Sequence, residues 1–445
     1  MKFRRCPMRA ALAMSMAALC LLALAGWQNP ARAQSLSSFD RQRYSEMLDA
    51  LKTDIRKNYY DENFHGINLD EHFKQAQEKV KKAASISQAL GIISQTLMDF
   101  NDSHLYFRPP GKAVKVEYGW RMNMIGDKCF ITAVKPGSDA EAKGLKPGDE
   151  IYSIDGFEPT RDNIWKMQLY YYVLHPKAGV KFVIQDRDGT QREVLAMAKV
   201  QEGKIIQDFE DMFSTGIREA EDADYLERNI FVTPKNSKDI IFWKMHTFVQ
   251  DPASMDARMK EVRKYKTLVL DLRGNGGGRV DALERLVGNF FDHDVKIADL
   301  KGRKKMDPQE AKGRKDYFTG KLIVLVDSGS GSASEIFART MQLEKRGVVL
   351  GDRSAGAVMQ ARGVGHESGV DIVAFYGASI TNADVIMTDG KSLEHVGVAP
   401  DEVILPTGTD MAAYRDPVLM RAAELAGFSL SPEEAGKLFP VEWKR

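Results

Sequence analysis

Residues 321–335 take a buried strand directly into a helix, and this junction constrains the fold more than any other segment. Residues 322–326 are aliphatic and mostly β-branched, which is typical of a strand buried on both faces. A serine at such a junction lies at a helix N-terminus, where unpaired N–H groups and the helix dipole can hold an oxyanion. The junction therefore predicts a serine nucleophile. The alternative reading assigns only linker and N-cap roles to the serines of this turn, Ser328, Ser330, Ser332 and Ser334.

The first residues have the pattern of an export signal. Lys2, Arg4 and Arg5 precede an apolar stretch over residues 10–25, and Ala31-Arg-Ala33 forms a small-x-small cleavage site. We therefore expect residues 1–33 to be a signal peptide and the mature chain to begin at Gln34. Export of this kind would place the protein in the periplasm or outside the cell.

Cysteine use, hydropathy and charge exclude several classes of protein. Leu19 precedes Cys20 where a lipoprotein signal needs a small residue, so no lipid anchor is expected. No later stretch is long and apolar enough to span a membrane, so the mature chain should have no integral membrane segment. Cys129 is the one cysteine after the signal, which rules out an internal disulfide. A formal charge of +1 gives no reason to expect nucleic acid as a partner.

The 445 residues favour a multidomain α+β fold. Residues 34–110 have apolar side chains at helical spacing and should form an N-terminal helical domain. Strands alternate with helices over residues 205–427, which predicts an α/β core with a parallel or mixed sheet. Residues 428–445 are expected to be a C-terminal tail. The sequence carries no signal for an oligomeric state.

Short alternating strands fill residues 112–200. The string Gly144-Leu-Lys-Pro-Gly-Asp, followed by Ile151-Tyr-Ser-Ile-Asp-Gly156, resembles the PDZ domain. This resemblance implies capture of a peptide through its C-terminal carboxylate on loop N–H groups, with the peptide added as a strand at a sheet edge. The candidate peptide-binding loop is Gly119, Trp120, Arg121 and Met122, which departs from the usual loop by carrying an arginine. The alternative is a structural domain that covers the active site and binds no peptide.

The glycine loop at residues 271–278 follows one strand and precedes one helix. A phosphate cradle is not expected here, because the loop lacks a Gly-Lys-Ser/Thr ending and Arg279 breaks the dinucleotide spacing. Glycines also let the backbone approach a substrate closely, and their N–H groups can form part of an oxyanion hole. We prefer this second use, and no cofactor is expected.

Three strings together resemble peptidase family S41, the C-terminal processing and tricorn-core peptidases. They are Asp271-Leu-Arg-Gly-Asn-Gly-Gly-Gly278, Ser330-Gly-Ser-Ala-Ser-Glu335 and Gly351-Asp-Arg-Ser-Ala-Gly356. The resemblance implies a ClpP/crotonase-like α/β core with Ser332 as nucleophile. It also implies an oxyanion hole made by the N–H groups of Ala333 and a loop glycine. We favour Gly277, because some relatives have proline at the position of Gly276.

One departure from the family decides the expected mechanism. Processing peptidases place a lysine 25 positions after the serine, where this chain has Ala357. Alanine cannot accept a proton, so the base must come from elsewhere. The tricorn branch uses a Ser-His pair and a later Glu, and this implies His104 as general base. Glu394 would then orient the imidazole, with Ser103 as a polar partner in the site.

Other residues compete for these roles. His366 and His395 are alternatives to His104, because the first follows a glycine-rich stretch and the second adjoins Glu394. No metal is expected, since the chain lacks a His-Glu-x-x-His string and Cys129 lies in a predicted strand.

These expectations combine into an exported serine peptidase that cleaves peptides or protein C-terminal tails through an acyl-enzyme on Ser332. One alternative is a non-catalytic peptide- or ligand-binding protein on the same fold. Another is hydrolysis of a non-peptide ester or amide by the same residues.

Overall fold

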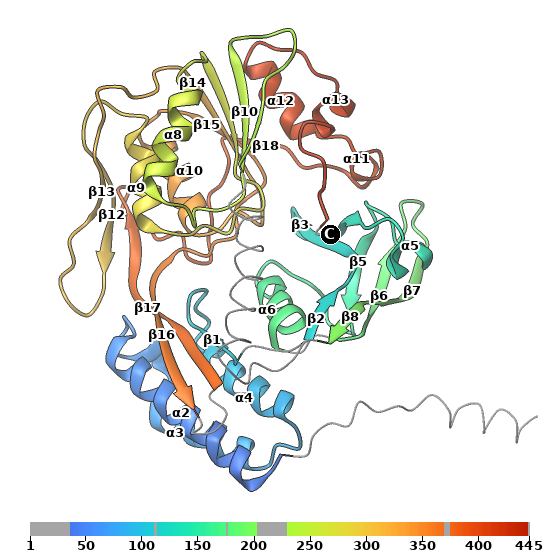
Figure 1. Cartoon of the computed structure of the whole chain (residues 1–445), viewed down its shortest axis with the longest axis vertical. Helices are drawn as coiled ribbons and strands as arrows, with labels where there is room; N and C mark the ends of the chain where they lie inside the picture. Colours follow the sequence, from blue (N-terminus) through green and yellow to red (C-terminus); the bar gives the residue numbers. More distant parts are fainter. Residues whose placement is uncertain (1–35, 111–113, 175–176, 203–228, 369–373, 444–445) are drawn as a thin grey trace, which may run out of the picture.

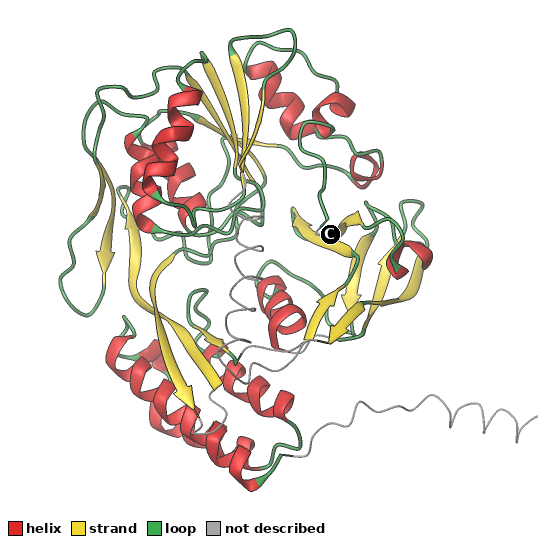
Figure 2. Ribbon diagram, in the orientation of Figure 1, coloured by secondary structure: helices red, strands yellow, loops and turns green. Residues whose placement is uncertain are grey.

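The computed structural model describes residues 36–110, 114–174, 177–202, 229–368 and 374–443. The expected signal peptide, residues 1–33, lies outside this range. Within it, no helix is long and apolar enough to cross a membrane. Figures 1 and 2 show a helical N-terminal part, a small strand-rich part and a larger α/β part.

The N-terminal part consists of helices that end in a short strand. Their bounds are α2 Ser38–Asn58, η1 Phe64–Gly66, α3 Leu69–Lys81, α4 Ile86–Met98 and β1 Tyr106–Arg108. The helices do not form an independent core, because their apolar faces pack against Tyr376, Ala378 and Ile380 of a long hairpin from the α/β part. In Figure 1 this hairpin, β16–β17, reaches down onto α2.

The strand-rich part is a five-stranded antiparallel sheet in the order β3-β4-β5-β6-β7, with a two-stranded β2–β8 ribbon beside it. Trp120 and Phe182 meet edge to face in its core. Its elements are β2 Val114–Glu117, β3 Trp120–Ile125, β4 Lys128–Val134, α5 Asp139–Ala142, β5 Glu150–Ile154, α6 Ile164–Leu169, η2 Tyr170–Leu174, β6 Gly179–Gln185, β7 Gln191–Met197 and β8 Lys199–Glu202. Strand β3 is an edge strand.

The α/β part is built on a six-stranded sheet in the order β18-β15-β14-β11-β10-β9, parallel except for β9. A second sheet, β1-β17-β12-β13 with β16 on β17, joins it to the N-terminal helices. The elements are β9 Asn229–Val232, β10 Ile240–Met245, α8 Pro252–Val262, β11 Thr267–Asp271, α9 Val280–Gly288, β12 Val295–Lys301, β13 Gln309–Ala311, β14 Lys321–Val326, α10 Ala333–Leu343, β15 Val348–Gly351, β16 Met359–Ser368, β17 Ala374–Met387, β18 Glu402–Val403, α11 Gly408–Ala412, α12 Pro417–Leu425 and α13 Pro432–Gly436.

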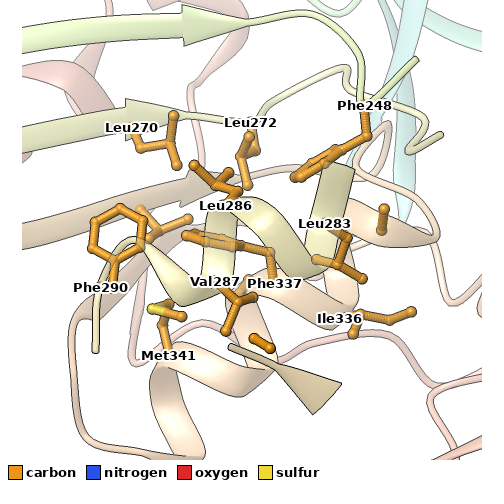
Figure 3. Close-up of a cluster of buried hydrophobic side chains, with 14 of the residues drawn as sticks. Phe248, Leu270, Leu272, Leu283, Leu286, Val287, Phe290, Ile336, Phe337 and Met341 are labelled. Atoms are coloured by element: carbon orange, nitrogen blue, oxygen red, sulfur yellow. The ribbon is translucent and has the colours of Figure 1, made fainter. Parts of the chain in front are cut away.

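Helices cover both faces of the parallel sheet (Figure 1). On one face, α9 and α10 pack on Leu270 and Leu272 through the hydrophobic cluster of Figure 3, which includes Phe290 and Phe337. On the other face, α12 packs on alternate residues such as Val269. The segment from residue 428 onward, which the sequence sets apart as a tail, adds α13 and places Phe428 and Phe439 against this second cluster.

A buried ion network fixes the glycine loop to α12. The Arg273 guanidinium donates to Asp271 (Nη2 to Oδ2, 2.8 Å) and to Asp416 at the start of α12 (Nη2 to Oδ2, 2.8 Å). Lys244 Nζ donates to the other oxygen of Asp271 at 3.1 Å. Burial alone would raise the pKa of Asp271, but the charges of Arg273 and Lys244 hold it well below its usual range.

We expect Arg273→Ala to lower the free energy of unfolding by about 3–5 kcal/mol, because it leaves Asp416 without its cation and the buried Asp271 with Lys244 alone. Urea denaturation measures this change. Lys264→Ala is the matched control, since it removes an exposed ion pair with Glu261 and should leave the midpoint unchanged. Equal midpoints for the two variants would contradict a stabilising role for the network.

Candidate active site

Ser332 stands immediately before α10 in a strained conformation, with φ 51° and ψ −118°. Ser332 occupies the N-cap position of α10, and its N–H donates to Oε2 of Glu335 at 3.0 Å. Its hydroxyl oxygen lies 3.3 Å from Nε2 of His104, a residue 228 positions away. A strained residue at a functional position is held there by its surroundings. Ser332 therefore combines the N-cap position with a hydroxyl that faces a histidine.

The other serines of the turn hold the loop together. Ser330 Oγ donates to the Leu272 carbonyl (2.9 Å), and Ser334 Oγ donates to the Asn275 carbonyl (2.8 Å). Both bonds fasten the turn after β14 to the glycine loop after β11. Ser328 Oγ reaches the other way and donates to the Met124 carbonyl of β3 (2.6 Å).

A chain of side-chain hydrogen bonds continues from the imidazole. Ser103 Oγ lies 2.8 Å from His104 Nδ1 and donates to Glu394 Oε2 at 2.8 Å. A hydroxyl has one hydrogen, so when Ser103 donates to Glu394 it must accept from Nδ1–H. This places the ring proton on Nδ1 and leaves Nε2 free to accept the Ser332 proton.

Glu394 is joined to the imidazole through Ser103, which the sequence analysis named only as a polar partner in the site. Its carboxylate also accepts the N–H of Ser103 at 2.9 Å and that of Val358 at 2.8 Å. Burial raises the pKa of Glu394, and the hydrogen bonds from Ser103 oppose that rise. Burial also lowers the pKa of His104, which favours the neutral imidazole.

The competing histidines lie elsewhere. His366 contacts Asp54 of α2 (Nε2 to Oδ2, 2.5 Å) and stacks on Tyr376. His395 Nε2 lies 2.9 Å from the Asn101 carbonyl and 3.6 Å from Glu394. Neither ring is placed against the Ser332 hydroxyl, so His104 is the histidine that faces it.

The expected oxyanion donors differ in their availability. Ala333 is the first residue of α10, where N–H groups have no intrahelical acceptor. The N–H of Gly277 donates to Asn275 Oδ1 at 2.9 Å, so in this conformation it is not available to an oxyanion, contrary to expectation. Gly277 instead allows the glycine loop to approach Ser332 closely. Its φ is 95°, and an added Cβ would lie 2.7 Å from the Ser332 Cβ.

Glu335, which the sequence analysis did not single out as a site residue, anchors the loop beside the nucleophile. Its buried carboxyl group accepts hydrogen bonds from four donors, the N–H groups of Ser332, Gly356 and Ala357 and the hydroxyl of Ser354. Burial raises its pKa to about 7. The spacing Ser-x-x-Glu at a helix start was the available sequence signal. Ala357, at the position of the missing lysine, also accepts the Ser332 N–H on its carbonyl (2.9 Å).

The candidate peptide-binding loop is not an open carboxylate cradle. Trp120 and Met122 are buried in the core of the strand-rich part, and Gly119 turns against Ser138 with φ 72°. Arg121 already has a partner within the chain. Its guanidinium donates to the Glu442 carbonyl (2.5 Å) and lies 4.7 Å from the centre of the Trp443 ring.

The open face of this part adjoins the catalytic loops. A cleft of about 280 Å³ is lined by Met124 of β3, by Trp165 of α6 and by Gly276, Gly331 and Ala357 of the core. An extended chain lying along β3 would therefore pass the turn that carries Ser332.

Replacing Gly277 by alanine should displace Ser332 and slow its reaction with a fluorophosphonate probe by about 10²-fold or more. Gly276→Ala is the matched control, because its added Cβ meets nothing within 4 Å. The labelling rate, with thermal unfolding as a check of folding, measures the effect. Rapid labelling of folded Gly277→Ala would show that the close approach does not position the serine.

Comparison with known proteins agrees with this architecture. Residues 239–404 match the sequence profile of peptidase family S41, and residues 113–168 match that of the PDZ domain. The carboxy-terminal processing protease CtpB of Bacillus subtilis (strain 168) is 27% identical over 371 residues, which cover 79% of this chain and 69% of the relative. The tail-specific protease of Haemophilus influenzae is 24% identical over 284 residues, which cover 62% of this chain but only 38% of that protein.

The solved structure of mature CPAF has a TM-score of 0.64 at 14% identity, and the match covers 84% of this chain and 95% of that one. At this identity the likeness shows the fold alone. The predicted multidomain fold and the predicted class, a serine-type peptidase, are confirmed by these matches together. The α/β part of this chain thus matches peptidase family S41 over residues 239–404, and a match to the PDZ domain lies ahead of it at residues 113–168.

Proposed function

We propose that this protein is an exported serine peptidase that cleaves peptides or the C-terminal tails of proteins through an acyl-enzyme on Ser332. The observation that carries the proposal is the chain of hydrogen bonds from Ser332 through His104 and Ser103 to Glu394. The names of the carboxy-terminal processing and tail-specific relatives support the substrate class.

The first half of the reaction uses the free Nε2 of His104. This nitrogen takes the hydroxyl proton while Ser332 Oγ attacks the scissile carbonyl carbon. The carbonyl oxygen becomes an oxyanion next to the Ala333 N–H and the positive end of the 11-residue helix α10. When the intermediate collapses, the peptide C–N bond breaks and the leaving amine takes the proton back from Nε2.

Deacylation repeats the steps with water. His104 removes a proton from the water that attacks the ester carbonyl, and it returns that proton to Ser332 Oγ as the acid product leaves. Ser103 and Glu394 hold the Nδ1 proton in place throughout. No lysine is needed, because the His104 imidazole is the general base. In processing peptidases a lysine at the position of Ala357 has this role.

The PDZ domain supplies the path to the serine. Its edge strand β3 and helix α6 line the same cleft as the catalytic loops, so a peptide added along β3 would lead into the site. Two side-chain bonds tie β3 to the catalytic turn, from Asn123 Nδ2 to Asp327 (3.0 Å) and from Ser328 Oγ to the Met124 carbonyl.

Export is the part of the proposal that rests on the sequence alone. The basic residues, apolar stretch and cleavage pattern of residues 1–33 support delivery to the periplasm or beyond.

Ser332→Ala and His104→Ala should each abolish cleavage of a peptide or protein tail and leave the thermal midpoint close to that of the wild type. The first change removes the nucleophile, and the second removes its base. His293→Ala is the matched control and should retain turnover, because that exposed ring pairs with Asp292 and not with Ser332. Binding of peptide without turnover in the wild type would favour the alternative of a non-catalytic binding protein.

Ser103→Ala should lower kcat by about 10²-fold, because the Nδ1 proton loses its acceptor and the productive tautomer is no longer favoured. KM should change little, since Ser103 lies behind the imidazole with respect to Ser332. Steady-state kinetics separate the two parameters. A normal kcat in the folded variant would contradict the relay through Ser103.

A further inference from the structure

A second carboxylate lies beside the catalytic histidine and is not used in the steps above. Asp102 is 1% exposed and precedes the Ser103-His104 pair directly. Its Oδ1 accepts the N–H of His104 (2.8 Å), the N–H of Leu105 (3.1 Å) and the hydroxyl of Thr381 (2.7 Å).

The other oxygen of Asp102 accepts from the hydroxyl of Tyr59, at the end of α2, at 3.0 Å. All four donors are neutral groups. The carboxylate is thus held by donors on both sides, from β17 through Thr381 and from α2 through Tyr59. Such an arrangement stabilises a buried anion without an adjacent cation and keeps its position fixed.

We propose that Asp102 is a positioning residue for His104, which fixes its backbone and supplies the buried negative charge that stabilises the imidazolium formed during catalysis. This inference deepens the proposed function and rests on it. Glu394 then has a different task, which is to hold the Nδ1 proton through Ser103 and to tie the histidine turn to Val358.

The electrostatics of the site agree with this division. Burial lowers the pKa of His104, and the charge of Asp102 opposes that change. The same charge adds to burial in raising the pKa of Glu394. An imidazolium next to Asp102 is therefore less costly than burial alone would make it.

Other titratable groups near the pair lie on η1, on α6 and on the loops that follow α2 and β17. His65 of η1 lies within 3.3 Å of the Tyr59 hydroxyl, and the Tyr60 hydroxyl lies 2.8 Å from the same ring. His395 lies 3.6 Å from Glu394, and Lys166 of α6 donates to the Asn101 side chain at 3.3 Å. Asp102 differs from these groups because it bonds directly to the backbone of His104.

Two substitutions separate the effect of the Asp102 charge from the effect of its hydrogen bonds. In Asp102→Asn the amide oxygen can keep the three bonds of Oδ1, and the amide nitrogen can face the Tyr59 hydroxyl, which is able to accept. This variant therefore removes the charge and leaves the tethers in place. Thr381→Val does the reverse, since it removes one tether and retains the charge.

Two measurements test the proposal in the full protein. NMR titration of the His104 ring, assigned with His104→Gln, should show Asp102→Asn moving its midpoint to lower pH by about one pH unit. The acid limb of the kcat profile should move with it, while kcat falls roughly tenfold or more and KM stays within a factor of about two. Thr381→Val should lower kcat without moving either midpoint.

Each outcome decides between two accounts. If Asp102→Asn is active and its midpoints are unchanged, the charge has no role and the inference is wrong while the proposed function stands. If the ring midpoint moves but the wild type hydrolyses no peptide, the proposed function fails and the electrostatic assignment remains. If Asp102→Asn does not fold, Thr381→Val and Tyr59→Phe keep the test open, because a lowered midpoint in these charge-retaining variants overturns the inference.

Discussion

The pairing of β1 with β17 is the contact on which the rest of the site depends. Tyr106, Phe107 and Arg108 pair with Ser379, Ala378 and Gly377. This short ladder holds the turn with Ser103 and His104 against the α/β core, and it brings together two residues that are 228 positions apart. Without it, Ser332 would have a helix terminus behind it but no base. The helical N-terminal part therefore serves the chemistry, because its packing on Tyr376 and Ile380 fixes the strand that delivers the histidine.

Buried carboxyl groups hold the other loops of the site in position. Glu335 binds the loop of residues 354–357 to the nucleophile, and Asp271 joins Arg273 to the start of α12. Glu394 spans the histidine turn and Val358. A buried carboxyl group is unfavourable unless donors surround it, so each one fixes the positions of several loops at once. These acids lie between loops and not at the surface, so their hydrogen bonds join the loops that carry the reacting atoms.

Much of this arrangement could be predicted from the sequence, and the exceptions have physical reasons. The strand-to-helix junction at Ser332, the glycine loop and the PDZ string follow from local periodicity and turn residues, and the S41 resemblance leads to His104 and Glu394. The interposed Ser103 hydroxyl, the use of the Gly277 N–H by Asn275 and the contact of Arg121 with Glu442 depend on side-chain directions between distant segments. Local patterns do not encode those directions. The role of the hairpin β16–β17 could not be predicted from local sequence patterns. The hairpin pairs with β1 and packs against α2, and these contacts join segments that are far apart in the chain.

The central claim is that Ser332, activated by His104, becomes acylated during turnover. Acid quench of the protein within the first turnovers on a peptide substrate, followed by peptide mapping and mass spectrometry, tests it most directly. The account predicts an acyl adduct on the fragment that contains Ser332 in the wild type and no adduct in His104→Ala. Hydrolysis without any adduct, or an adduct on another serine, would contradict it.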